Sequence, residues 1–366
     1  MKDFVFGGLP SRVVFGHGCL ARVGDELARL GVQRALVLST PGQRVLAERV
    51  AALLDARAVG IHARAVMHVP VESAELARAE AARLNADACV AIGGGSTIGL
   101  GKAIALTAGL PVIAVPTTYA GSEMTPIYGL TENGLKRTGR DPRVLPKTVL
   151  YDPQLSLQLP PGVSAASGMN AIAHAVEALY AEDANPVVSL MAEESIRAMA
   201  RALPRVAATP ADPEARADAL YGAWLGGSCL GAVGMSLHHK LCHTLGGSFN
   251  LPHAEVHAVV LPHVASFNHV ARPDALARVA AALGADGAPA AGPALFGLAR
   301  ALGLQTSLRA LGLTRAQLRE AAALATANPY YNPRRSDFDA VLGLLEAAYE
   351  GRPPDPAGAP TANGRA

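Results

Sequence analysis

The sequence predicts two domains, an α/β domain over residues 1–160 followed by an all-helical domain over residues 161–350. The length of 366 residues exceeds what one hydrophobic core usually serves. Short apolar runs alternate with longer amphipathic stretches through the first 150 residues. After Leu159-Pro160-Pro161-Gly162 the strand-like runs stop, and helix follows helix to about Tyr349.

Four short apolar runs have the composition of buried strands, at 35–39, 88–92, 111–115 and 148–152. The amphipathic stretches at 43–56, 72–84 and 96–106 have the periodicity of helices. This alternation is typical of a parallel sheet with crossover helices. Ligands of such a sheet bind at the carboxyl ends of its strands.

Two further stretches carry clear turn or break signals. Thr131-Glu132-Asn133-Gly134 places an Asn-Gly turn between two β-capable segments, which predicts a small hairpin around 127–136. In the helical domain, breaks are expected near Pro204, Pro252, Pro262 and Pro293. The tail, 351–366, holds four prolines and three glycines and is predicted to be disordered.

Composition excludes several classes of protein. The net charge is only +2, and the arginines form no basic run, which argues against nucleic-acid binding. No apolar stretch approaches the ~18 residues that span a bilayer, and the start lacks the apolar segment of a signal peptide. We therefore expect a cytoplasmic protein. The four scattered cysteines form no CxxC pair, which predicts buried free thiols.

A glycine-rich stretch, Gly93-Gly94-Gly95-Ser96-Thr97, joins a predicted strand to a predicted helix. The backbone amides of Gly94, Gly95 and Ser96 would face a ligand at the positive end of the helix dipole, which suits a pyrophosphate. The stretch matches neither a P-loop nor GxGxxG. A tight turn without a ligand is the alternative.

The next predicted strand ends in a second polar loop, Pro116 to Glu123, which strengthens the case for a dinucleotide. The first strand ends in Ser39-Thr40, without the acidic residue that normally binds the ribose and excludes NADP. We therefore expect NADH or NADPH. Beyond the glycine stretch, its predicted contacts are Ser39, Thr40, Thr117, Thr118, Ser122 and Lys147.

Seven of the eleven histidines fall between His238 and His269. His239 and His243 are four residues apart on one predicted helix, His253 begins the next, and Asn170 and His174 repeat the spacing upstream. Such pairs deliver metal ligands or proton donors into a common pocket. Taken singly, His238, His257, His263 and His269 are predicted to be structural or exposed.

Together these motifs, with Gly121-Ser122-Glu123 and His239-Lys240-Leu241-Cys242-His243, resemble the iron-containing alcohol dehydrogenase superfamily over residues 1 to 350. The resemblance implies that superfamily's fold, which dehydroquinate synthase shares. Its metal-dependent members hold iron or zinc with one Asp and three His, and the matching positions here are Asn170, His174, His239 and His253.

Asn170 departs from that pattern, because a neutral amide neither offsets the charge of a divalent cation nor binds it strongly. We therefore expect no metal. This replacement, the stretches 119–126 and 129–134, and Thr138 to Arg143 resemble the maleylacetate reductase branch.

That resemblance implies reduction of the activated carbon-carbon double bond of maleylacetate to 3-oxoadipate during degradation of aromatic compounds. His243 and His174 are the leading candidates to stabilise the developing charge and supply a proton, with His239, His253 and Asn170 beside them. The small dicarboxylate substrate needs cationic partners, for which Lys136 and Lys240 are candidates, together with Tyr119. We expect a homodimer.

Three alternatives remain open from the sequence. A metal-dependent alcohol dehydrogenase could replace the missing ligand with water. A lyase resembling dehydroquinate synthase would use NAD only transiently and would need a metal. A nucleotide-binding protein without catalysis would keep the glycine stretch alone.

Overall fold

The computed structural model describes residue 4 and residues 6–9, 11–132 and 135–358. The chain forms two compact units, which we describe separately. The α/β unit comprises Gly8–Leu159 with Ala211–Leu220, and the helical unit contains the other described residues. The main division therefore lies beside the boundary predicted at 160. Two short segments differ from the prediction, because residues before Gly8 group with the helical unit and 211–220 with the α/β unit.

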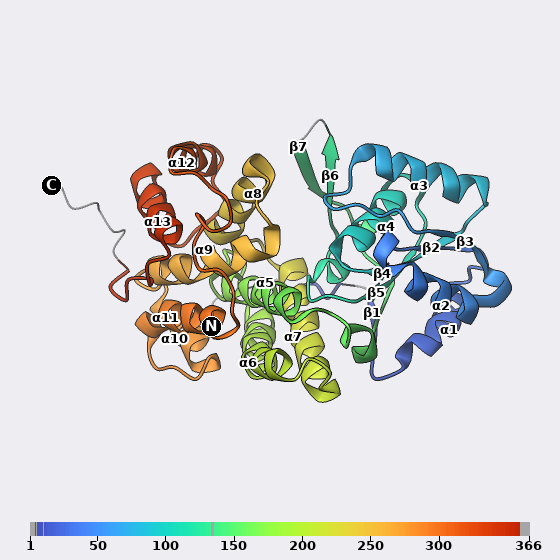
Figure 1. Cartoon of the computed structure of the whole chain (residues 1–366), viewed down its shortest axis with the longest axis horizontal. Coiled ribbons are helices and arrows are strands. Elements are labelled where there is room, and N and C mark those ends of the chain that lie inside the picture. Colours follow the sequence, from blue (N-terminus) through green and yellow to red (C-terminus); the bar gives the residue numbers. More distant parts are fainter. Residues whose placement is uncertain (1–3, 5, 10, 133–134, 359–366) are drawn as a thin grey trace. The chain divides into compact units, whose positions relative to one another are not determined.

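The α/β unit is built on a six-stranded sheet with the order β1-β8-β5-β4-β2-β3, in which every strand pair is parallel (Figure 1). The four predicted strands are β2 (Ala35–Leu38), β4 (Ala88–Gly93), β5 (Val112–Pro116) and β8 (Thr148–Tyr151). Strands β1 (Arg12–Phe15) and β3 (Ala58–His62) were not predicted from the sequence. Both lie at edges of the sheet and are partly exposed, so they lack the continuous apolar run of a central strand.

Helices cover both faces of this sheet: α1 (Val23–Arg29), α2 (Arg44–Leu54), α3 (Val71–Arg83) and α4 (Gly95–Ala108). One sheet face, with Val37, Val90 and Val115, packs with α1 and α2 into a continuous core. The other face packs against α4, where a Cβ at Gly101 would lie 3.4 Å from the Cβ of Ala91. The three helices expected from periodicity are α2, α3 and α4, whereas α1 is too short to have been found.

The predicted hairpin is confirmed. Strands β6 (Ile127–Glu132) and β7 (Leu135–Arg140) pair in antiparallel register, with Glu132 opposite Leu135. The Asn133-Gly134 turn itself lies outside the described residues.

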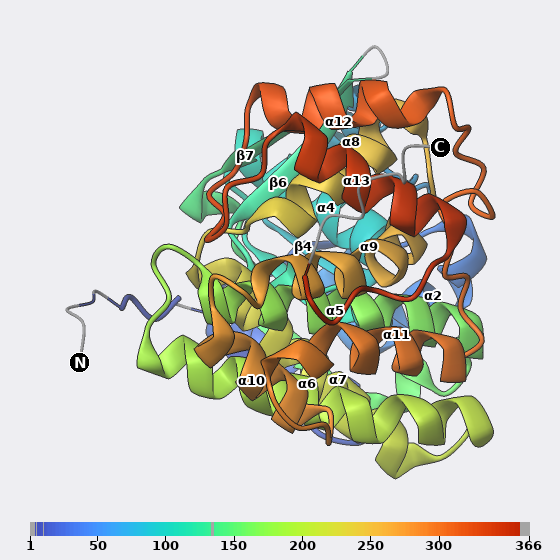
Figure 2. The ribbon, with the colours of Figure 1, turned by 90° about the vertical axis from the view of Figure 1, so that its left-hand side faces the viewer.

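Helix α5 (Pro161–Tyr180) of the helical unit is buried along nearly its whole length. Helices α6 (Pro186–Ala208), α9 (His253–Asn268) and α10 (Pro273–Ala282) contact α5, as Figure 2 shows. The others are α7 (Pro213–Ala232), α8 (Leu237–Phe249), α11 (Ala291–Ala301), α12 (Gln317–Ala327) and α13 (Phe338–Glu350). Helix α7 belongs to this unit from Tyr221 onward, whereas its residues up to Leu220 belong to the α/β unit.

Two predicted helix breaks are wrong. Pro204 lies inside α6 and Pro262 inside α9. An interior proline costs about 3 kcal/mol of helix stability, but the buried faces of both helices offset that loss. Pro252 does mark a boundary, as the N-cap of α9, and Pro293 lies in the first turn of α11.

The prediction of a disordered tail is wrong for residues 351–358. Helix α13 is capped by Gly351 in the left-handed conformation, and the chain then folds back. The Arg334 guanidinium donates a hydrogen bond of 2.6 Å to the carbonyl of Gly358, which is buried. The composition of the tail could not predict this order, because the hydrogen bond to Gly358 comes from Arg334, which lies outside the tail.

The four cysteines are free and buried, as predicted. Within the described residues, no single helix is long and apolar enough to cross a membrane, although α7 and α8 pass that test when taken together across a bend.

Candidate active site

The glycine stretch lies at the carboxyl edge of the sheet, where β4 ends at Gly93 and α4 begins at Gly95. Gly93 has a φ of +151°, and a Cβ there would lie 2.5 Å from the Oγ1 of Thr97, so this position requires glycine. Gly94, Gly95 and Ser96 are partly exposed. The first amides of α4 have no intrahelical acceptor and therefore suit a phosphate.

The second polar loop lies beside the first. The Thr117 amide bonds the Gly93 carbonyl, and a Cβ on Gly94 would lie 3.1 Å from the Thr118 hydroxyl. Thr118 is partly exposed, whereas Thr117 is buried and accepts a hydrogen bond from Gln43. At the end of β2, Ser39 is fully buried and Thr40 partly exposed.

Lys102 in α4 holds the second loop in place. Its buried ammonium donates hydrogen bonds to the carbonyls of Ser122 and Ile127 and to the hydroxyls of Ser122 and Thr125. Burial lowers the pKa of Lys102 to about 7, although Glu123 acts in the opposite direction. Ser122, predicted to touch the cofactor, is therefore bonded to Lys102 through its carbonyl and its hydroxyl.

One predicted cofactor contact, Lys147, and one predicted substrate contact, Tyr119, are wrong. The side chain of a third predicted residue lies outside the described part of the chain. Lys147 precedes β8 at the amino edge of the sheet, so a strand of roughly 13 Å separates it from the phosphate side. Tyr119 is fully buried, and its hydroxyl bonds Arg216 within the same unit, so it does not present itself to substrate. The side chain of Lys136 is outside the described residues.

In the helical unit, Asn170, His174 and Glu177 share one face of α5 at i, i+4 and i+7 spacing, and all three are buried. The Oδ1 of Asn170 and the Nδ1 of His174 have no hydrogen-bond partner among the described residues. Burial, followed by the neighbouring His239, holds the pKa of His174 well below its usual value. His174 is therefore a neutral imidazole at pH 7.

Glu177, which was not predicted as a site residue from the sequence, holds the start of α8 and the ring of His239 in place. Its carboxylate accepts hydrogen bonds from the amides of Ser236 and His238, and so caps the positive end of α8. The same carboxylate accepts a 2.7 Å bond from the Nδ1 of His239. The Nε2 of His239 has no hydrogen-bond partner in the described part of the chain, and the His239 ring stacks on that of His174 at a centroid distance of 5.1 Å.

Three further imidazoles are linked through their ring nitrogens: His238 and His257 are buried, and His253 is partly exposed. The Nε2 of His238 lies 2.8 Å from the Nδ1 of His257, whose Nε2 lies 3.2 Å from the Nε2 of His253. The thiol of Cys242 lies 3.5 Å from His238. His238 and His257, expected to be structural or exposed, are thus buried members of the cluster.

His243 completes the cluster on its more open side, with its ring parallel to that of His253 at a centroid distance of 6.2 Å. Its Nδ1 lies 3.2 Å from the hydroxyl of Tyr330. The ammonium of Lys240, one turn earlier on α8, lies 5.5 Å from the centre of the same tyrosine ring. The structure therefore brings Asn170, His174, His239, His243, His253 and Lys240 into one region.

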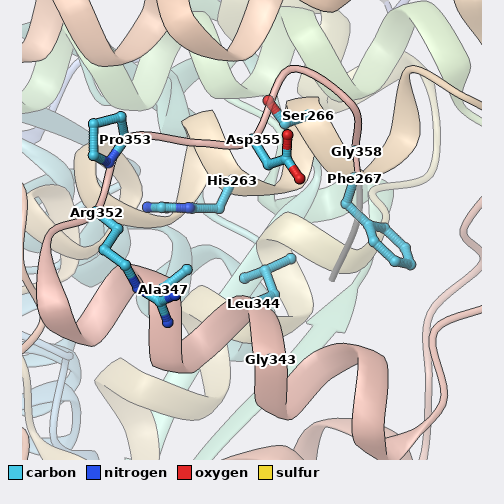
Figure 3. Close-up of a pocket in the computed structure, with 10 residues that line it drawn as sticks. All are labelled: His263, Ser266, Phe267, Gly343, Leu344, Ala347, Arg352, Pro353, Asp355 and Gly358. Carbon is cyan, nitrogen blue, oxygen red and sulfur yellow. The ribbon is translucent and has the colours of Figure 1, made fainter. Parts of the chain in front are cut away.

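His263 belongs to a separate cavity of about 60 Å³, lined also by Ser266, Arg352 and Asp355 (Figure 3). The Nε2 of His263 and the Oγ of Ser266 have no protein partner among the described residues. Burial, and then the Arg352 guanidinium, lowers the pKa of His263 to about 4. This cavity has room for ordered water.

The two units and their polar sites match one known family. A model of the iron-containing alcohol dehydrogenase covers residues 10–153, and a model of the Fe-containing alcohol dehydrogenase family, C-terminal, covers residues 164–349. The chain belongs to the iron-containing alcohol dehydrogenase family and is an oxidoreductase.

Several relatives are similar over almost the whole chain. A maleylacetate reductase of Burkholderia cepacia is 59% identical, over 96% of this chain and 99% of that protein. The structure of maleylacetate reductase from Agrobacterium tumefaciens is 53% identical with a TM-score of 0.93, covering 97% of this chain and 100% of that one. The enzyme from Rhizobium sp. strain MTP-10005 is 54% identical with the same TM-score and coverage.

Proposed function

We propose that this chain is an NAD(P)H-dependent maleylacetate reductase, which reduces the activated double bond of maleylacetate to 3-oxoadipate. The observation that carries the proposal is the group of Asn170, His174 and His239, which keeps imidazoles but replaces the acidic ligand with an amide. The names of the relatives, at 51–59% identity, support the same assignment.

The residues present do not fit a divalent cation. Asn170 offers a neutral oxygen, and the nearby carboxylate of Glu177 is already bonded to His239 and to the start of α8. Among the described residues, His174, His239 and His253 do not bring three ligand atoms within 4.8 Å of one another. The set that does, His238, Cys242 and His257, has two of its members hydrogen-bonded to each other. We therefore propose catalysis without a metal.

The α/β unit fits NADH or NADPH, which supplies a hydride when bound. Gly94, Gly95 and Ser96 would hold its pyrophosphate through the first amides of α4, with Thr118 alongside. The end of β2 carries Ser39 and Thr40 without a carboxylate that would repel a 2′-phosphate. We propose that both forms of the cofactor are accepted.

Reduction of the double bond requires a hydrogen-bond donor for the ketone oxygen and a proton donor for the carbon beside it. Hydride adds to the alkene carbon farther from the ketone, which leaves an enolate, and the carbon next to the ketone then takes one proton. A neutral, buried His174 would donate a hydrogen bond to the enolate oxygen. His243, which is partly exposed, would supply the proton and recover it from solvent. His239, oriented by Glu177, and His253 would hold substrate or these two rings.

The proposal is tested by following the decrease in NADH absorbance when the enzyme is mixed with freshly generated maleylacetate. We expect one NADH consumed per 3-oxoadipate formed, at a rate unchanged after dialysis against a chelator. Iron- or zinc-dependent oxidation of simple alcohols, without maleylacetate reduction, would instead establish the metal-dependent dehydrogenase. Turnover without net NADH consumption would establish a lyase. The homodimer and the cytoplasmic location stay predictions.

A further inference from the structure

Tyr330 lies over two side chains of one helix face. Lys240 and His243 are three residues apart on α8, and Tyr330 reaches both, with its ring facing the Lys240 ammonium and its hydroxyl bonded to the Nδ1 of His243. It comes from the loop between α12 and α13, more than 80 residues away in the chain. Nothing in the periodicity of that loop distinguishes this tyrosine.

The loop that carries Tyr330 is fixed to α9. Two residues farther on, the amides of Asn332 and Asn268 exchange hydrogen bonds of 2.8 and 2.9 Å. Arg334 then donates to the carbonyl of Phe267 and stacks over its ring, 4.1 Å from the centroid. These contacts hold the loop, and with it Tyr330, in a fixed position on α9.

Lys240 lacks the usual partner of a lysine. No carboxylate lies within ion-pair distance of its ammonium in the described part of the chain, where the ammonium makes no hydrogen bond and its one ring contact is with the face of Tyr330. A cation–π contact orients an ammonium but leaves its three N–H donors available. Such a cation beside a candidate proton donor suits an anionic ligand.

We propose that Lys240 binds one carboxylate of the substrate and that Tyr330 is a positioning residue, which ties that carboxylate site to the orientation of His243. The inference rests on the proposed function, since it assigns the dicarboxylate to the same group of residues. Burial raises the pKa of Tyr330, so its phenol stays protonated at neutral pH. When the phenol donates to Nδ1, the hydrogen of a neutral His243 is placed on Nε2.

Steady-state kinetics at saturating NADH separates the two roles. Lys240→Met should raise the KM for maleylacetate at least 10-fold, because a charged hydrogen bond to the carboxylate is lost, and should leave the KM for NADH unchanged. Tyr330→Phe keeps the ring and removes the hydroxyl, so kcat should fall about 10-fold with little change in KM. Tyr330→Leu, which removes both contacts, should alter both constants.

Tyr331→Phe is the matched control, because Tyr331 is the next tyrosine of the same loop and is similarly exposed, while the contacts with Lys240 and His243 are those of Tyr330, so its constants should equal those of the unaltered enzyme. Adipate, an unreactive dicarboxylate, provides a readout without turnover: calorimetry should show at least 10-fold weaker binding to Lys240→Met than to the unaltered protein. Equal adipate affinity in the two proteins, or an unchanged kcat in folded Tyr330→Phe, would overturn the inference. A chain that binds adipate through Lys240 but does not reduce maleylacetate would overturn the proposed function alone.

Discussion

The carboxylate of Glu177 lies 2.7 Å from the Nδ1 of His239, and both side chains are buried within the helical unit. One acidic side chain thereby caps α8 and selects the nitrogen through which His239 faces its neighbours. At metal sites, a carboxylate that orients a ligating histidine typically changes activity 10- to 100-fold when removed, and we take the lower end of that range for this metal-free group.

Glu177→Gln should therefore lower kcat roughly 10-fold or more and reduce the free energy of unfolding by about 2 kcal/mol, because the charged acceptor of buried donors is lost. Kinetics and urea denaturation measure the two effects. Glu182→Gln, five residues later and exposed, is the control and should change neither. Unchanged kcat in a folded Glu177→Gln protein would show that Glu177 acts only as a cap.

Gly93 and Gly95 should respond differently to substitution. A Cβ at Gly95 meets only the Cβ of Ala120, at 3.9 Å, so Gly95→Val should fold normally while its side chain fills the space proposed for the pyrophosphate. We expect the KM for NADH to rise at least 10-fold with an unchanged Tm. Gly93→Ala is the comparison, since its clash with Thr97 and its φ of +151° should lower the Tm. A normal KM in Gly95→Val would remove the amides of α4 from the cofactor site.

Asn170→Asp tests the role of the missing carboxylate. Without metal, the new buried charge should lower the Tm, and zinc should restore it, because the variant offers the acidic ligand that metal-dependent relatives use. Thermal unfolding with and without zinc, with metal analysis of the purified protein, gives the answer independently of activity. The control is Asn185→Asp, where the side chain caps α6 away from the cluster. Zinc binding by the unaltered protein as tight as that of Asn170→Asp would contradict the argument that the residues present do not fit a divalent cation.

The helical unit should lose stability as the solution becomes acidic. The pKa of His263 is about 4 when folded against an ordinary value of 6.5, so the unfolded chain binds more protons between these values. Its contribution, at most about 3 kcal/mol, is complete above pH 6.5 and is lost as the pH falls toward 4. Other buried histidines, such as His174 and His257, act in the same direction.

His263→Asn should accordingly show a shallower decline in urea stability between pH 6.5 and 4. The fluorescence of Trp224, the single tryptophan, reports on the unit that contains His263. His17→Asn, which alters an exposed histidine, should follow the unaltered protein. An identical pH dependence in His263→Asn and His17→Asn would mean that His263 is not held neutral by the fold.

The sequence by itself determined the α/β and helical pattern, the glycine stretch at Gly93 to Gly95 and the enrichment in histidine. Each of these is a local property: periodicity reports which faces are buried, and glycine reports where the backbone needs a positive φ or a close approach. The spacing of Asn170 and His174 already placed them on one helix face. Glu177 continues that spacing, so the same signal could have found it.

Only the tertiary structure decided which of the candidate site residues lie close together in space. Lys147 looked suitable as a cation near the motifs, yet the direction of β8 puts it at the opposite edge of the sheet from Gly94. Tyr330 had no local signal, because its contacts with His243 and Lys240 cross more than 80 residues of chain. Such contacts depend on how helices pack, and packing is fixed by the whole core rather than by neighbours in sequence.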